Sequence, residues 1–193
     1  AAWPDVQGLP PALWPWGEAN PQPGVAFSLG SPRRLSVVSI EDDELRALAE
    51  SLQRQGEAVV VLDPGHEGLK DLASALVQQG GGYDQIQIFG HGADDRFRIG
   101  QTLLSTRTLW RHAQALKTLG EALRPGGDLL LYGCSLAESS RGQQLISRIA
   151  ALTGADVAAS TDRTFADGLA NDWDLEYSTG AIADGAFKDR KST

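Results

Sequence analysis

Two residues of the chain combine the chemistry of a nucleophile with that of a base: Cys134, its only cysteine, and His91. A thiol becomes a good nucleophile when a nearby imidazole accepts its proton. Glycines flank the histidine at Gly90 and Gly92, and Gly133 precedes the cysteine. Because glycines leave the backbone accessible, N–H groups at these positions could point at a developing oxyanion. The residue types therefore predict a Cys–His dyad.

The segments before the two residues predict where they lie. IQIF comes directly before Gly90-His91, and LLLY comes directly before Gly133-Cys134. Short apolar runs of this kind are typical of buried parallel strands, whose carboxyl ends meet at one edge of the sheet. Both side chains are expected at that edge. The alternative is a buried structural cysteine and an incidental histidine, since free cysteines are among the most commonly buried residues.

The remaining pattern predicts a single α/β domain. Strand-like runs lie in residues 35–40, 58–65, 85–92, 128–134 and 155–161, and helical spacing lies in residues 41–56, 69–82, 105–123 and 143–154. This alternation predicts a three-layer sandwich with a mostly parallel sheet covered on both faces. Residues 173–178 are expected to form an edge strand or a hairpin, anchored by Trp173. The predicted organisation is a Pro/Trp-rich extended arm (1–33), the α/β domain (34–182) and a polar tail (183–193).

Composition limits the partners. The formal net charge of −8 is spread along the chain with no basic block, which argues against nucleic acid as a partner. A single cysteine excludes an intramolecular disulfide and zinc sites built from paired cysteines. No run of about 18 apolar residues predicts a membrane span. The absence of methionine, even at position 1, suggests that the chain is part of a longer polypeptide.

Two further signals are weaker. His66 in DPGHEG is expected at the same sheet edge, where it could contact substrate, but HEG lacks the second histidine of a zinc-protease helix. No cofactor is predicted. Calcium remains an alternative without EF-hand spacing, on the acids Asp167, Asp172, Asp174 and Glu176.

The motifs FGHG and LLLYGCS, in the order strand, His-Gly, helix, strand, Gly-Cys, resemble the caspase-like (clan CD) cysteine peptidases. More narrowly, the runs VVVLDPG, IFGHG, LLLYGCSLAESSRG, LTGADVAASTD and NDWDLEYSTG are similar to the bacterial domain DUF4347. The resemblance implies a caspase-like fold with flavodoxin-like strand order. It also implies a place in a large secreted or cell-surface adhesin-like protein, although a chain without disulfides suits the cytosol too.

By this resemblance Cys134 is the nucleophile, His91 is the general base, and the backbone amides of Gly92 and Cys134 are the oxyanion donors. The superfamily builds the pocket for the P1 side chain beside the ends of the first and last core strands. Acidic residues at those ends would favour Arg or Lys at P1. The residues at those ends are Glu41, Asp42, Asp43 and Asp162, while the neighbouring Arg163 leaves aspartate as an alternative.

The function implied is a cysteine endopeptidase acting on a peptide or protein, including its own parent chain. Basic sites for self-processing lie at Arg33-Arg34, at Arg141 in the expected loop after Cys134, and in residues 188–191. The alternative is a non-catalytic caspase-like module of a bacterial adhesin. A flavodoxin-like binder of small molecules also fits the sheet but leaves the placement of His91 and Cys134 unexplained.

Overall fold

The computed structural model describes residues 32–162 and 173–183, which belong to the larger of the two compact units of the chain. The expected arm up to residue 31, the tail from residue 184 and the segment 163–172 lie outside the described residues.

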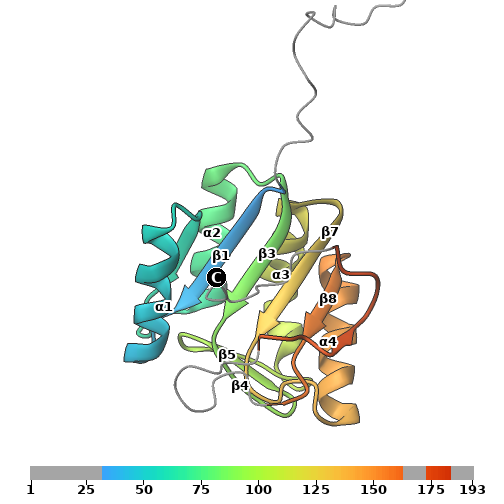
Figure 1. The fold of residues 1–193 in the computed structure, drawn as a ribbon. Helices are drawn as coiled ribbons and strands as arrows, with labels where there is room; N and C mark the ends of the chain where they lie inside the picture. The colour runs from blue at the N-terminus through green and yellow to red at the C-terminus, as the bar shows by residue number, and fades with distance from the viewer. Residues whose placement is uncertain (1–31, 163–172, 184–193) are drawn as a thin grey trace, which may run out of the picture. The chain divides into compact units, whose positions relative to one another are not determined.

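The main sheet has six strands in the order β2-β1-β3-β7-β8-β9 (Figure 1). The first five are parallel to one another, and β9 pairs antiparallel with β8. The strands are β1 (Arg34–Ser39), β2 (Val59–Leu62), β3 (Tyr83–Phe89), β7 (Leu123–Tyr132), β8 (Asp156–Ala159) and β9 (Tyr177–Ser178). The prediction of an α/β domain with a mostly parallel sheet is confirmed. Taken in chain order, the parallel strands follow the order 2-1-3-4-5, which places the topological switch point between β1 and β3.

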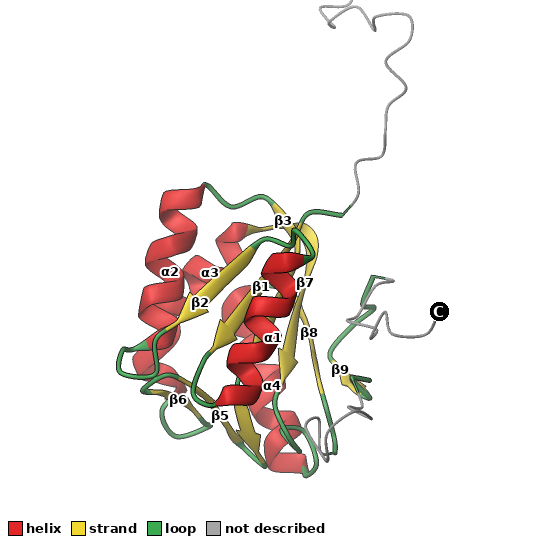
Figure 2. Cartoon of the chain, turned by 60° about the vertical axis from the view of Figure 1, so that its left-hand side comes forward, coloured by secondary structure: helices red, strands yellow, loops and turns green. Residues whose placement is uncertain are grey.

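In the described part of the chain, four α-helices and a short 3-10 helix, η2, connect the strands. They are α1 (Asp43–Arg54), α2 (Gly68–Gln79), η2 (Leu109–His112), α3 (Ala113–Ala122) and α4 (Ser140–Thr153). The buried leucines and isoleucines of α2, α3 and α4 pack in one hydrophobic cluster on one face of the sheet. The buried residues of α1 pack in a second cluster on the other face together with Trp173 (Figures 1 and 2).

A second, three-stranded antiparallel sheet, ordered β4-β5-β6, was not predicted from the sequence. It consists of β4 (His91–Ala93), β5 (Arg96–Ile99) and β6 (Thr102–Leu104), and it lies beyond the carboxyl ends of the main strands (Figure 1). These strands are too short to give a strong pattern. The signal was nevertheless present in β5, where exposed arginines alternate with the buried Phe97 and Ile99.

Two predicted boundaries were wrong. The expected helix 105–123 starts only at Leu109, and β7 begins at Leu123 rather than at residue 128. Leu123 pairs with Tyr83, and the register then shifts before Asp128 pairs with Gln85. The glycine-containing segment between Leu123 and Asp128 is therefore a bulge inside a strand and not only the end of a helix. Residues 173–178 do supply an edge strand, but only Tyr177 and Ser178 pair with β8.

Candidate functional site

His91 and Cys134 follow neighbouring parallel strands. Phe89, the last residue of β3, is in register with Tyr132, the last residue of β7. The Gly90 N–H donates to the Tyr132 carbonyl at 3.1 Å, so the pairing continues to the residue before His91. The arrowheads of β1, β3, β7 and β8 point to the same edge of the sheet (Figure 1). The expectation that both residues lie at one edge agrees with this geometry.

The backbones beside the two residues are in direct contact. A Cβ placed on Gly92 would lie 2.5 Å from the Gly133 carbonyl carbon and 2.7 Å from the Cys134 nitrogen. A Cβ on Gly133 would lie 2.9 Å from the ring of Phe97 in β5. Any larger residue would force these segments apart. The sequence interpretation took the glycines as room for substrate, whereas here they let the segments that carry His91 and Cys134 pack together.

A carboxylate from the loop between β1 and α1 holds the imidazole. Nε2 of His91 lies 2.9 Å from Oδ2 of Asp42 and 3.9 Å from Oε2 of Glu41. The other oxygen of Asp42, Oδ1, accepts the Leu45 N–H at 2.9 Å and so caps α1. The His91 side chain is 47% exposed, which leaves it accessible to a substrate.

Cys134 is half-buried, neither in the core nor fully exposed. The loop that follows it is tied to the turn after β8, because the N–H of Ser135 donates to the carbonyl of Asp162 and the N–H of Ala137 donates to the carbonyl of Ser160 at 2.9 Å. Ser135 adopts the left-handed region at φ 50°. The chain thus turns sharply directly after the cysteine.

Glu176 fixes the turn after β8. Its Oε2 accepts the Thr161 N–H at 2.7 Å and the Thr161 hydroxyl at 3.1 Å. The Ser160 hydroxyl donates to Oδ1 of Asp162 at 2.9 Å. These bonds explain why Asp162 is held beside the loop of Cys134.

The acids expected around one P1 pocket do not gather in one place. Glu41 and Asp42 lie on the β1 side, next to His91, whereas Asp162 lies on the β8 side, next to the loop of Cys134. Strands β3 and β7 separate the two groups, a spacing of roughly 14 Å at about 4.8 Å per strand. Asp43 is the exposed first residue of α1. The expectation of a shared acidic pocket therefore does not fit the strand order.

His66 lies away from the dyad. It follows β2, which β1 and β3 separate from β7, and its Nδ1 lies 3.2 Å from Oδ2 of Asp71. Within residues 32–162 and 173–183 no group of three or more His, Cys, Asp or Glu side chains could hold a metal ion. Of the acids considered for calcium, Asp174 and Glu176 are described, and Asp167 and Asp172 lie outside the described residues, as does Arg163.

The prediction that Arg141 lies in a loop open to cleavage was wrong. Arg141 lies in the first turn of α4, not in the loop after Cys134, and its guanidinium is 3.4 Å from Oδ2 of Asp95. Arg34 lies in β1, and residues 188–191 lie outside the described residues. A helical, ion-paired arginine cannot enter a peptidase cleft in an extended conformation without local unfolding.

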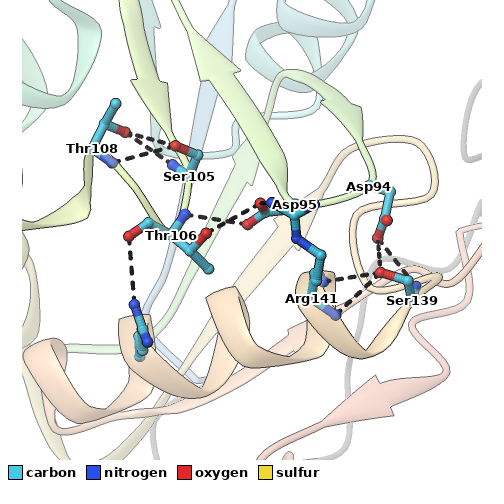
Figure 3. A network of polar contacts seen from close by, with 9 residues as sticks. Asp94, Asp95, Ser105, Thr106, Thr108, Ser139 and Arg141 are labelled. Carbon is cyan, nitrogen blue, oxygen red and sulfur yellow. Dashed lines mark hydrogen bonds and ion pairs between the residues drawn. The ribbon is translucent and has the colours of Figure 1, made fainter.

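Asp94 and Asp95 form the turn between β4 and β5 and were not among the predicted site residues (Figure 3). Asp94 accepts hydrogen bonds from Ser139, and Asp95 accepts them from Thr106. Two consecutive aspartates between short alternating runs are a turn signal that could have indicated this hairpin.

A cavity of about 530 Å³ lies between α2 and the segment formed by η2 and α3. Its lining includes Lys70, Val77, Arg111 and His112, and none of the residues expected at the dyad site. Burial lowers the pKa of His112, an effect that Glu67 opposes.

None of the described helices has the length and apolar character needed to cross a membrane.

Comparison with known proteins places the chain in a family. No curated protein and no solved structure matches it. The model for "Domain of unknown function (DUF4347)" matches residues 36–193, which cover the main sheet from the third residue of β1 onward and every residue of the candidate site. The chain therefore belongs to the DUF4347 family.

Proposed function

We propose that this domain is a cysteine endopeptidase-type domain of caspase-like arrangement, with Cys134 as the nucleophile and His91 as the general base. The observation that carries the proposal is the contact of Gly92 with Gly133 and Cys134 at the ends of β3 and β7. This contact joins the two segments that carry the dyad. The pairing of His91 with Asp42 adds an acid that can orient the imidazole.

The first step forms a tetrahedral intermediate at Cys134. Because Nε2 of His91 faces Asp42, Nδ1 is the nitrogen left to accept the thiol proton. The resulting thiolate attacks the carbonyl carbon of the scissile peptide bond, and a C–S bond forms. Asp42 stabilises the imidazolium. The amides of Gly92 and Cys134 serve as oxyanion donors, since the amides of Ser135 and Ala137 already donate within the protein.

The second step releases the products. When the tetrahedral intermediate collapses, the C–N bond breaks and the imidazolium proton passes to the leaving amine. A water molecule then attacks the thioester while His91 takes its proton. The C–S bond breaks, the proton returns to the sulfur, and the second product leaves as a carboxylic acid.

Asp162 is the acid placed best to recognise a basic P1 side chain. It is exposed, and its carbonyl bonds to the residue directly after Cys134. Its Oδ1 accepts from Ser160, so the carboxylate is oriented before any substrate binds. An Arg or Lys side chain would form a charge-assisted hydrogen bond there. The substrates would include the larger secreted or surface protein of which the domain is a part.

The reactivity of the single thiol tests the dyad without knowledge of the substrate. At pH 6 an isolated cysteine is almost entirely protonated and reacts slowly with iodoacetamide. We expect Cys134 of the folded chain to be alkylated at pH 6 at least about tenfold faster than in His91→Ala, because the imidazole takes the thiol proton. Mass spectrometry follows the reaction without background, since the chain has one cysteine.

The urea-unfolded chain gives the reference rate of an ordinary cysteine. A peptidyl electrophile ending in Arg should label Cys134 roughly ten- to a hundredfold faster than one ending in Asp. Equal alkylation of wild type and His91→Ala, together with no labelling by either electrophile, would favour the non-catalytic module.

A further inference from the structure

The turn of the hairpin that carries His91 is bonded to the chain that follows Cys134. His91 starts β4, and Asp94 follows the last residue of that strand. Oδ1 of Asp94 accepts the Ser139 hydroxyl at 2.7 Å and the Ser139 N–H at 3.1 Å (Figure 3). Ser139 ends the loop that begins at Cys134, so one carboxylate joins the two segments that carry the dyad.

The carboxylate of Asp94 lies against the start of α4. Ser139 is the N-cap of this helix, and its hydroxyl oxygen accepts the N–H groups of Arg141 at 3.1 Å and Gly142 at 3.4 Å. A Cβ on Gly142 would lie 2.8 Å from Oδ1 of Asp94, so the absence of a side chain there makes room for the carboxylate. A negative charge at a helix N-terminus is favourable because the helix dipole is positive there.

Asp95 strengthens the same connection from the other side of the turn. Its side chain is buried, and its backbone is left-handed at φ 59°. Its carboxylate accepts the N–H and the hydroxyl of Thr106 at 3.2 Å and 3.1 Å, and it pairs with Arg141 of α4. The turn is therefore fixed both to α4 and to the segment after β6.

We propose that Asp94 is a positioning residue for the Cys134–His91 pair. By fixing the β4–β5 turn to Ser139, Asp94 sets the distance and orientation at which the two side chains meet. The inference rests on the proposed function. The buried Phe97 and the contact of Gly92 with Gly133 hold the base of the hairpin. The Asp94–Ser139 bonds act farther along the hairpin, past His91, and restrain its rotation about that base.

Alkylation of Cys134 in the full-length chain tests this role. Asp94→Ala is expected to lower the alkylation rate at pH 6 about tenfold, towards the rate of His91→Ala, because a displaced imidazole no longer takes the thiol proton. At pH 9, where a free thiol ionises without help, the rates of Asp94→Ala and wild type should converge. Asp94→Asn keeps an oxygen acceptor for Ser139 and should restore most of the rate at pH 6. A purely structural role would not produce this pH dependence.

Asp84→Ala is the matched control. Asp84 also accepts a backbone N–H, that of Arg33 at 2.7 Å, and pairs with Arg124 at 3.2 Å, but it lies at the amino end of β3. Its loss should leave the rate unchanged. Ser139→Gly removes the shorter bond to Asp94 while glycine still serves as an N-cap, so it should lower the rate if Asp94→Ala does not fold.

The outcomes separate the two proposals. Equal rates in wild type and His91→Ala would refute the dyad itself. If His91→Ala is slow and Asp94→Ala or Ser139→Gly reacts at pH 6 as fast as wild type, the dyad stands and the positioning role of Asp94 is refuted.

Discussion

The carboxylate of Asp42 serves two groups at once. One oxygen caps α1 and the other pairs with His91, so the bond to the helix fixes the oxygen that the imidazole meets. The sequence interpretation gave Asp42 to the substrate pocket. With both oxygens engaged, orienting His91 is the better role, since a carboxylate that bonds an imidazole sets both its orientation and its charge.

Two substitutions of Asp42 separate its tasks. Asp42→Asn keeps an N-cap oxygen and should leave the melting temperature close to wild type, while alkylation of Cys134 at pH 6 falls because the imidazolium loses its counter-charge. Asp42→Ala should show the same loss of rate and also lose about 1 kcal/mol of stability, or roughly 2–4 °C in melting temperature. Thermal unfolding and alkylation measure the two effects. An Asp42→Asn protein that reacts like wild type would show that the charge has no role.

At this scale the sequence predicted which residues lie at the edge of the sheet but not which of them meet. His91 and Cys134 follow apolar runs with glycine beside them, and parallel topology alone brings such residues to one edge. The pairing of His91 with Asp42 depends on β1 and β3 being neighbours, which the order of elements along the chain does not specify. The bonds of Asp94 depend in addition on a hairpin that was not predicted.

At the scale of elements, the parallel strands were predictable from continuous apolar runs such as VVVL and LLLY. The run LLLY is buried in β7 as expected, whereas VVVL forms the edge strand β2, in which only Leu62 is buried. The antiparallel hairpin was not predictable, because β4 and β6 have three residues each; β4 buries none of its residues and β6 buries two. Their position depends on tertiary packing, with Phe97 of β5 inserted against Gly90 and Gly133. The short alternation in β5 predicts a strand only when it is considered together with the glycines against which Phe97 packs.

On the face of the sheet that packs against α1, three aromatic side chains form a cluster. Trp173 packs edge-on against Phe89 and Tyr132, with ring centroids 5.7 Å away in both cases, and those two rings stack on each other at 4.7 Å. Phe89 and Tyr132 end the strands that lead to His91 and Cys134. Trp173 therefore packs against the last residue of both strands that lead to the candidate site.

Trp173→Ala should be strongly destabilising. Trp173 is 8% exposed, and truncation of a buried tryptophan leaves a cavity that typically costs about 3–5 kcal/mol. Trp110→Ala is the control, because Trp110 is 72% exposed and should lose far less. Urea unfolding of both variants measures the difference. Similar losses for the two would mean that the aromatic cluster does not support the sheet.

For the molecule as a whole, the face of the sheet that carries the aromatic cluster becomes polar near the amino ends of β3 and β7. Gln85, Gln87 and Asp128 are buried there, and the amide of Gln87 donates to Gln85 at 2.8 Å. Asp128 is 1% exposed; its Oδ2 accepts the Ala183 N–H at 2.8 Å. Burial raises the pKa of Asp128 above its usual value, and the negative charge of Asp156 adds to the effect, whereas the Ala183 N–H opposes it.

This carboxyl should make stability depend on pH. With its pKa higher in the folded chain than in the unfolded chain, the folded chain binds the proton more tightly, so this contribution is favourable in acid. It is lost as the pH rises from the usual value near 3.8 through the raised pKa. Relative to wild type, Asp128→Asn should therefore gain free energy of unfolding as the pH rises over this range. Urea unfolding across a pH series measures the difference, and a value independent of pH would contradict the assignment.

The contact between Gly92 and Gly133 has a consequence for how such a domain diverges. A descendant could replace the thiol of Cys134 or the imidazole of His91 and keep the scaffold, because neither side chain fills the core. It could not place a side chain at Gly92 without displacing the backbone of Gly133 and Cys134, or at Gly133 without displacing the ring of Phe97. Selection on the scaffold and selection on the reaction thus act on different residues. Across the family, retention of the two glycines alone would report only an intact architecture, whereas joint retention of the histidine and the cysteine is expected if the proposed reaction is under selection.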